Sequence, residues 1–270
     1  MNLKTKVLKL CVLALALSPV AICQQDSGSL VVLRVTPDYA VLAADSVNKR
    51  ECAATEKVQL TYDVCKAMAF ENQYIVAVAG FYARHVSCTS DQTIWNVRVI
   101  TADLYKNGKI SNVGDFANKW SDKMISVLEQ DYKSGGRSVQ NSNGGVLVGF
   151  FIGRSKGQIT TYDVNIRTDG NGHFQSDIGI LAPNGDVAAA GEASIVAEYR
   201  DRTTERSKLW HEEIGKLAPA DQVIALVRLE ERFGRGEVVG GSIDAVEMNP
   251  FSSKWVQRKK ACEDFEQHPH

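Results

Sequence analysis

The stretch that decides the fold reads SLVVLRV (residues 29–35), TPD (36–38) and YAVLAADS (39–46), then CKAMAF (65–70), ENQ (71–73) and YIVAVAG (74–80). Its four short apolar runs are separated by turn residues, which predicts strands joined by hairpins. Two charged residues, Asp45 and Lys66, fall where such strands would be buried. A buried charge is costly unless it is paired, so we expect each of them to need the other or a site.

The composition of the whole chain is that of an ordinary globular protein. Its 270 residues are 44% hydrophobic and 23% charged, which allows one domain of roughly 240 residues, or two small ones, to bury a full core. The formal net charge is -1, and no basic stripe with interleaved aromatic residues occurs. These features argue against nucleic acid or an anionic membrane as a partner.

The segment 1–23 has the order of a secretory signal peptide. Lysines at positions 4, 6 and 9 precede and enter an apolar run over residues 7–17, and Ala21 and Cys23 are small enough for cleavage before Gln24. About a dozen apolar residues are too few to span a bilayer, which argues against a membrane anchor. We therefore expect an exported protein, periplasmic or secreted, with no membrane span after signal removal.

Removal of the signal peptide would leave an even set of cysteines, at Cys52, Cys65, Cys88 and Cys262. In an oxidising compartment this set predicts two disulfides, for which three connectivities are open. A buried free thiol at Cys65 is the alternative. No pair has the Cys-x-x-Cys spacing of a zinc site, so neither a metal nor a cofactor is expected.

The rest of the chain alternates blocks of helix and strand. Apolar periodicity predicts helices over residues 91–105, 112–136, 193–214 and 219–233. Apolar runs predict strands over 144–153, 158–166, 173–181, 187–190 and 241–248. Because strands and helices segregate, we expect an α+β fold, arranged as a four-layer αββα sandwich of two antiparallel sheets flanked by helix pairs. The C-terminal tail, residues 251–270, is expected to be solvated apart from Cys262.

Several motifs, in this order, resemble the proteasome beta-type subunits of the N-terminal nucleophile (Ntn) hydrolase superfamily. The matching text is VLAADS (41–46), Cys65-Lys66 and Ala79-Gly80, with weaker matches at Ala190-Gly191 and GGSID (240–244). The resemblance covers residues 29–250 and implies one Ntn-hydrolase-like domain there. It also implies a peptidase or amidohydrolase that acts on a peptide or other amide, and it allows a homo-oligomer.

The resemblance assigns a role to each of four residues. The family's nucleophile begins the processed chain, and the spacing from Asp45 gives Ser29 this position, with Gly28 before it as at the family's self-cleavage site. Residues 24–28 would then be a short pro-segment. Asp45 and Lys66 match the family's acidic residue and lysine, and the backbone N–H of Gly80 would form the oxyanion hole.

These residue types suit the implied chemistry. A hydroxyl is a poor nucleophile until a base takes its proton, and a free α-amine on Ser29 can be that base. A charged Lys66 disfavours protonation of the amine, and Asp45 would hold Lys66 charged and oriented. Oxyanion stabilisation contributes roughly 3–4 kcal/mol to such a reaction.

Departures from the family pattern keep a second hypothesis open. Ser29 replaces the usual threonine, Glu192 replaces a serine, and Gly236 and Val239 replace an aspartate and a further serine. The first hypothesis is a secreted Ntn hydrolase, and the second is a catalytically inactive proteasome-like domain that acts as a binding or assembly module. In the second, Asp45 and Lys66 form a structural ion pair, Ser29 opens a strand and Gly80 ends one. Glu192 can also cap the helix that follows it.

Overall fold

The computed structural model describes residues 24–27, 29–52, 57–62, 64–87, 90–136, 144–155, 157–234, 239–260 and 262. These residues form a mixed α+β structure in three five-stranded sheets, whose strand pairings are all antiparallel. The prediction of an α+β fold with antiparallel sheets is therefore confirmed. Within the described part of the chain, no helix has the length and apolar character needed to span a membrane.

The central sheet contains the longest strands and has the order β12-β11-β10-β7-β6. Its strands are β6 (Ala67–Phe70), β7 (Tyr74–Gly80), β10 (Gly145–Ser155), β11 (Gln158–Thr168) and β12 (Phe174–Ile180). The unbroken apolar run predicted as a buried strand forms β10, which pairs with β7 on one side and β11 on the other. The hairpin β6–β7 turns through Glu71 and Asn72, both with positive φ, as tight hairpin turns require.

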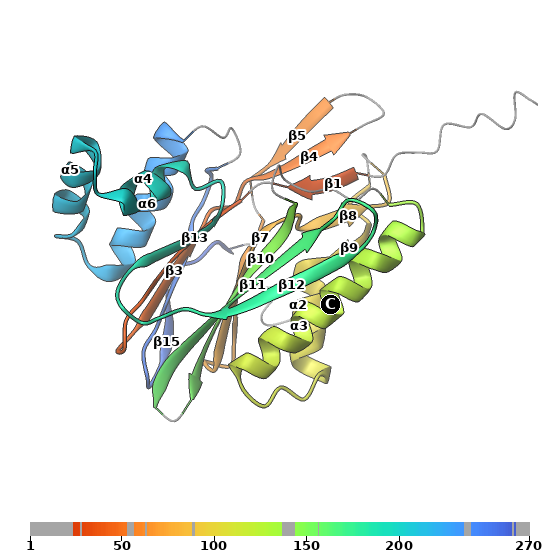
Figure 1. Cartoon of the computed structure of the whole chain (residues 1–270), viewed down its shortest axis with the longest axis horizontal. Coiled ribbons are helices and arrows are strands. Elements are labelled where there is room, and N and C mark those ends of the chain that lie inside the picture. Colours follow the sequence, from red (N-terminus) through yellow and green to blue (C-terminus); the bar gives the residue numbers. More distant parts are fainter. Residues whose placement is uncertain are drawn as a thin grey trace, which may run out of the picture.

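A second sheet, with the order β13-β2-β3-β14-β15, packs against one face of the central sheet (Figure 1). Its strands are β2 (Leu30–Val35), β3 (Ala40–Ala44), β13 (Val187–Gly191), β14 (Asp244–Met248) and β15 (Ser253–Gln257). Leu33 and Leu42 of this sheet share one buried cluster with Ile75 and Ile152 of the central sheet. The four runs quoted at the outset thus form β2, β3, β6 and β7, on both sides of this shared core.

A third, smaller sheet was not predicted from the sequence. It has the order β5-β4-β1-β8-β9 and consists of β1 (Gln24–Ser27), β4 (Asn48–Cys52), β5 (Lys57–Thr61), β8 (Ala83–His85) and β9 (Thr93–Asn96). No strand was predicted between Ser46 and Cys65, although Val58 and Leu60 of β5 alternate with polar residues; β4, with the sequence NKREC, has no such alternation. β1, which comes directly before the predicted nucleophile, pairs with β4 and β8.

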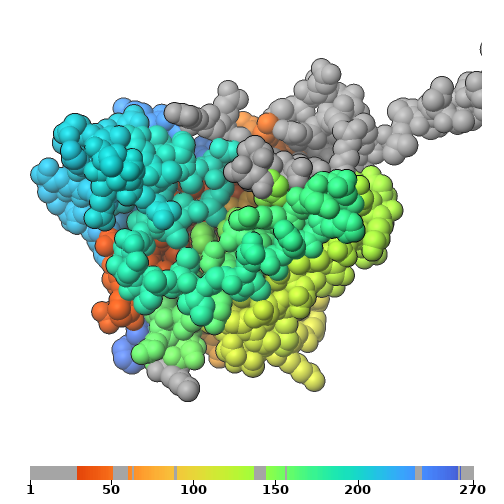
Figure 2. All heavy atoms as spheres, viewed as in Figure 1, coloured from red at the N-terminus to blue at the C-terminus, as the bar shows by residue number. Residues whose placement is uncertain are grey.

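Helices cover the outer faces of the two large sheets (Figure 1). Helices α2 (Val97–Asn107) and α3 (Val113–Lys133) pack on the central sheet, where Phe116 and Trp120 contact Phe151. Helices α4 (Ser194–Asp201), α5 (Glu205–Ile214) and α6 (Pro219–Phe233) pack on the second sheet. Figure 2 shows the green-to-teal segment that contains β12 crossing the surface between these two groups of helices.

Two predicted helices have different bounds in the structure. The helix expected over 193–214 is divided into α4 and α5, because Arg202 adopts a left-handed conformation with φ 56° and Thr204 starts a new helix by accepting a bond from the Ser207 N–H. The helix expected from residue 91 begins later, at Val97, because Asn96 caps it and the residues before it form β9. Periodicity detects the apolar face of a helix better than it detects its ends.

The shared core between the two large sheets predicts a strong effect of truncation. Replacing the fully buried Ile75 with alanine leaves a cavity, so we expect Ile75→Ala to lower the free energy of unfolding by about 2–5 kcal/mol. Urea unfolding measures this loss. The matched control is Ile180→Ala, which makes the same change at a residue that is 68% exposed and should cost less than about 0.5 kcal/mol. Equal losses in both variants would contradict the packing described above.

Candidate active site

Asp45 and Lys66, the two charged residues predicted to be buried, form an ion pair. Asp45 lies immediately after β3 and Lys66 immediately before β6, and both side chains are fully buried. Lys66 Nζ lies 2.7 Å from Asp45 Oδ1 and also donates to the carbonyl of Val47. The expectation that each charge needs the other is thereby met.

Backbone N–H groups hold the Asp45 carboxylate from several sides. The N–H of Leu30 donates to Oδ1 at 2.7 Å, and the N–H groups of Val47 and Gly240 donate to Oδ2 at 3.2 and 3.3 Å. These donors come from the start of β2, from the residues after β3 and from the chain before β14. These bonds fix the position of the Asp45 carboxylate, so that it orients Lys66.

Burial and Asp45 have opposite effects on the pKa of Lys66. Burial lowers the pKa of Lys66 from 10.5 to about 8, although the charge and hydrogen bond of Asp45 raise it, while the charge of the nearby Lys259 lowers it further. A lysine with this pKa can take up or release a proton near neutral pH, which is a property of lysines that take part in catalysis.

The hydroxyl of Ser29 faces the backbone N–H of Gly80. That N–H donates to Ser29 Oγ at 3.0 Å. Gly80 has φ 109°, and a Cβ at this position would collide with the carbonyl oxygen of Val146, so only glycine fits. Ser29 itself is 2% exposed, and its carbonyl accepts the N–H of Glu192 at 2.9 Å.

The structure therefore brings all four predicted residues into one region. Ser29 contacts Gly80, and the amide of Leu30, the next residue, contacts the Asp45–Lys66 pair. Gly28, and with it the predicted cleavage site, lies outside the described residues, as does Gly236. Val239 is buried close to this region, just before Gly240.

Glu192 does not cap the helix that follows it. It is exposed, whereas the carboxylate of Glu230, on α6, accepts the N–H groups of Ser194, Ile195 and Val196 at the start of α4. Glu230 is almost fully buried. Sequence reasoning missed it because this carboxylate belongs to a different helix, and local capping patterns do not reveal such a contact.

The C-terminal segment, predicted to be solvated, encloses the residues around Lys66. Lys259 Nζ donates to the carbonyl of Val64, and Arg258 Nη1 donates to the carbonyl of Ala67 at 3.1 Å. Cys262 forms a disulfide with Cys65, with a Cα–Cα distance of 5.7 Å. The backbone on each side of Lys66 is therefore held by residues from the far end of the sequence. We call residues 258–260 and 262 the C-terminal clamp.

The clamp is held in turn by a buried carboxylate at the start of β14. Asp244 Oδ1 accepts the backbone N–H of Lys259 at 2.9 Å, and Asp244 Oδ2 lies 3.2 Å from Lys259 Nζ and 3.5 Å from Arg258 Nη1. Burial lowers the pKa of Lys259, and Asp244 opposes this effect. Asp45–Lys66 and Asp244–Lys259 are thus neighbouring buried ion pairs, and only the first was expected.

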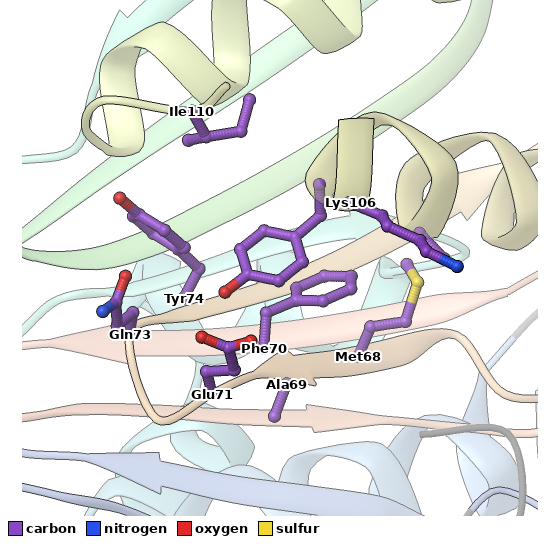
Figure 3. A pocket seen from close by; sticks show the side chains of 10 residues that line it. Met68, Ala69, Phe70, Glu71, Gln73, Tyr74, Lys106 and Ile110 are labelled. Carbon is purple, nitrogen blue, oxygen red and sulfur yellow. The ribbon is translucent and has the colours of Figure 1, made fainter. Parts of the chain in front are cut away.

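A cavity on the central sheet lies away from Ser29. It has a volume of 460 Å³ and is bounded by the β6–β7 hairpin on one side and by α2 with the residue Ile110 on the other (Figure 3). In Figure 3, Met68, Phe70 and Tyr74 extend from the strands toward Lys106 and Ile110. None of the four predicted site residues lines this cavity.

Neither a search for metal ligands among the described residues nor a comparison with known proteins identifies a function for this chain. Within the described ranges, no group of three or more histidine, cysteine, aspartate or glutamate residues is arranged to hold a metal ion. Comparison with protein-family models and with curated proteins finds no match to this chain.

The disulfide of the C-terminal clamp should contribute measurably to stability. It connects residues separated by 197 positions, and such a long loop restricts the unfolded chain strongly, so we expect Cys65→Ala/Cys262→Ala to lower the free energy of unfolding by about 2–5 kcal/mol. Urea unfolding with and without a reductant measures this. Reductant should destabilise the parent protein and leave the double variant much less affected; a double variant as stable as the parent would contradict a structural role.

The pKa of Lys66 predicts how stability depends on pH. Because this pKa is about 8 when folded, below the ordinary 10.5, the unfolded state binds more protons between these values, and the free energy of unfolding rises with pH across that window. The contribution of Lys66, on the order of 3 kcal/mol, is complete above pH 10.5 and is lost as the pH falls through about 8. The difference in stability between the parent and Lys66→Met/Asp45→Asn, measured from pH 7 to 11, should show this rise. A difference that stays constant would mean that Lys66 keeps an ordinary pKa.

Proposed function

We propose that the two large sheets and their helices form the four-layer αββα sandwich of the Ntn hydrolases. Three buried apolar clusters support this proposal: one between α2–α3 and the central sheet, one between the two sheets, and one between the second sheet and α4–α6. This succession of layers buries both faces of each large sheet. The third sheet would then be an addition at one end of the sandwich.

Within this fold, we propose a secreted hydrolase that resembles proteasome beta-type subunits and cleaves a peptide or other amide bond. One observation carries the proposal. The Gly80 N–H donates to Ser29 Oγ, while the amide of the adjacent residue, Leu30, donates to the carboxylate that holds Lys66. A hydroxyl and a neighbouring backbone N–H can serve as the nucleophile and the oxyanion donor of acyl transfer, and a buried lysine close to them can tune the base.

Each of these groups has a role in the proposed reaction. The free α-amine of Ser29 takes the proton of the hydroxyl as Oγ attacks the amide carbon, and the Gly80 N–H stabilises the negative charge that develops on the carbonyl oxygen. The amine then gives its proton to the leaving amine. Water hydrolyses the resulting ester and restores Ser29. Lys66, held by Asp45, keeps the α-amine unprotonated by its positive charge.

This mechanism requires that the chain first be cut before Ser29. In the uncut chain the nitrogen of Ser29 belongs to a peptide bond, and residues 24–27 form β1 in front of it. We propose that Ser29 Oγ attacks the preceding carbonyl carbon, so that the acyl group moves from nitrogen to oxygen. Hydrolysis of this ester releases the carboxyl group of residue 28 and leaves the free α-amine on Ser29.

Export fits the disulfide between Cys65 and Cys262, because such bonds persist in oxidising compartments. The alternative function is an inactive proteasome-like module for binding or assembly. Its support is the near-complete burial of Ser29 together with the departures at Glu192, Gly236 and Val239. The two proposals differ in one measurable property, which is the N-terminus of the mature chain.

The proposed self-cleavage predicts a specific mass for the mature protein. Intact-mass measurement of the exported protein should give a chain that begins at Ser29, and Ser29→Ala should retain residues 24–28 and lose hydrolysis. The matched control, Ser134→Ala, changes an exposed serine at the end of α3 and should be processed normally.

Two results would decide against the hydrolase. A parent chain that begins at Gln24 and remains stable for hours would favour the inactive module. Normal processing of Ser29→Ala would remove Ser29 from the mechanism, whatever the N-terminus of the parent chain. Near-ultraviolet circular dichroism of each variant establishes that a lack of processing is not a lack of folding.

A further inference from the structure

A second cavity, separate from the region around Ser29, has a polar and cationic lining. It has a volume of 340 Å³ and lies where α4, α5 and α6 meet the edge of the second sheet formed by β2 and β13. Its charged lining residues are Arg34, Asp186, Arg200 and Arg202. The volume falls within the range of small-molecule sites in proteins.

One arginine of this cavity is fixed in place by its own hydrogen bonds. Arg34 Nε donates to the carbonyl of Gly185 at 2.9 Å, and its Nη1 donates to Oε1 of the buried Gln222. Gln222 is held in turn by a bond from its Nε2 to the carbonyl of Leu217 at 2.8 Å. Arg34 Nη2 has no hydrogen-bond partner among the described residues, so this donor stays available to a ligand.

An aromatic pair forms a rigid wall of the cavity. Tyr199 stacks on His211 with ring centroids 3.9 Å apart, and His211 Nε2 donates to the carbonyl of Tyr199 at 2.7 Å. Burial raises the pKa of Tyr199, whereas the charges of Arg34 and Arg202 lower it. Both guanidinium groups therefore lie close enough to the phenol for their fields to act on it.

The charges around this cavity do not balance. Three arginines line it, and none of them has an ion-pair partner in the described part of the chain. Asp186, the one acidic lining residue, accepts a hydrogen bond from Asn184 Nδ2 at 2.7 Å. This excess of positive charge contrasts with the net charge of -1 for the whole chain. Two other arginines of these helices are paired, Arg206 with Glu198 and Arg228 with Glu231.

We propose that this cavity binds a small multivalent oxyanion of the phosphate class. Guanidinium groups donate two parallel hydrogen bonds to such oxygens, and several of them around one cavity neutralise more than one negative charge. The Tyr199 side chain and the free donor of Arg34 add direction to the site. This proposal is independent of the proposed hydrolase, because no residue of the Ser29 region takes part in it.

The test is calorimetric titration with pyrophosphate at constant ionic strength, repeated with citrate. The parent protein should bind pyrophosphate saturably with one site, and more tightly than citrate. Arg200→Gln/Arg202→Gln should weaken pyrophosphate binding by roughly ten-fold or more, because each lost charged hydrogen bond is worth about that factor. Both side chains are exposed, so the variant should keep the melting temperature of the parent without ligand.

The matched control is Lys208→Gln/Arg228→Gln. It also removes two positive charges, but from positions on α5 and α6 that do not line the cavity. It should bind pyrophosphate as the parent does. The proposal is overturned if the parent shows no saturable binding, or if the control loses as much affinity as the cavity variant. Tighter binding of citrate than of pyrophosphate would overturn the phosphate assignment.

Discussion

The buried ion pair between Asp45 and Lys66 is the contact on which the rest of the structure depends. Removing a carboxylate and an ammonium group from water costs free energy. Their mutual attraction offsets this cost only when other hydrogen bonds satisfy their remaining donors and acceptors. Backbone donors from three parts of the chain serve the carboxylate, and the carbonyl of Val47 accepts from the lysine. The pair thereby fixes the start of β2, the end of β3, the start of β6 and the approach to β14 relative to one another.

Local patterns in the sequence were sufficient for the strands and helices that face the main cores. Short apolar runs predicted β2, β3, β6 and β7. Periodicity predicted the bounds of α3 and α6 closely, but placed the start of α2 at residue 91 instead of Val97. The pairing of Asp45 with Lys66 also followed from the sequence, because two charges inside apolar runs must be neutralised. The grouping of Ser29 and Gly80 with that pair was implied by the family resemblance, and their hydrogen bond is consistent with it.

The parts that could not be predicted are those in which distant polar residues meet. Arg258 and Lys259 lie in a charged run that resembles a solvated tail, yet Asp244 and the carbonyl groups beside Lys66 bind them. Glu230, on α6, accepts backbone N–H groups at the start of α4, and β4 lacks an apolar alternation. The pairing of Cys65 with Cys262, one of three connectivities open for four cysteines, is likewise set by the tertiary structure.

The C-terminal clamp has a consequence for the order in which the molecule is built. Lys66 is synthesised early, but the residues that hold the backbone on both sides of it follow nearly 200 positions later, since the linked cysteines are separated by 197 positions. A nascent chain that ends before residue 262 lacks the cysteine that pairs with Cys65, so the C-terminal clamp cannot yet have formed. The surroundings of Lys66 therefore reach their final form only at a late stage of biosynthesis, after oxidation has joined two remote parts of the polypeptide.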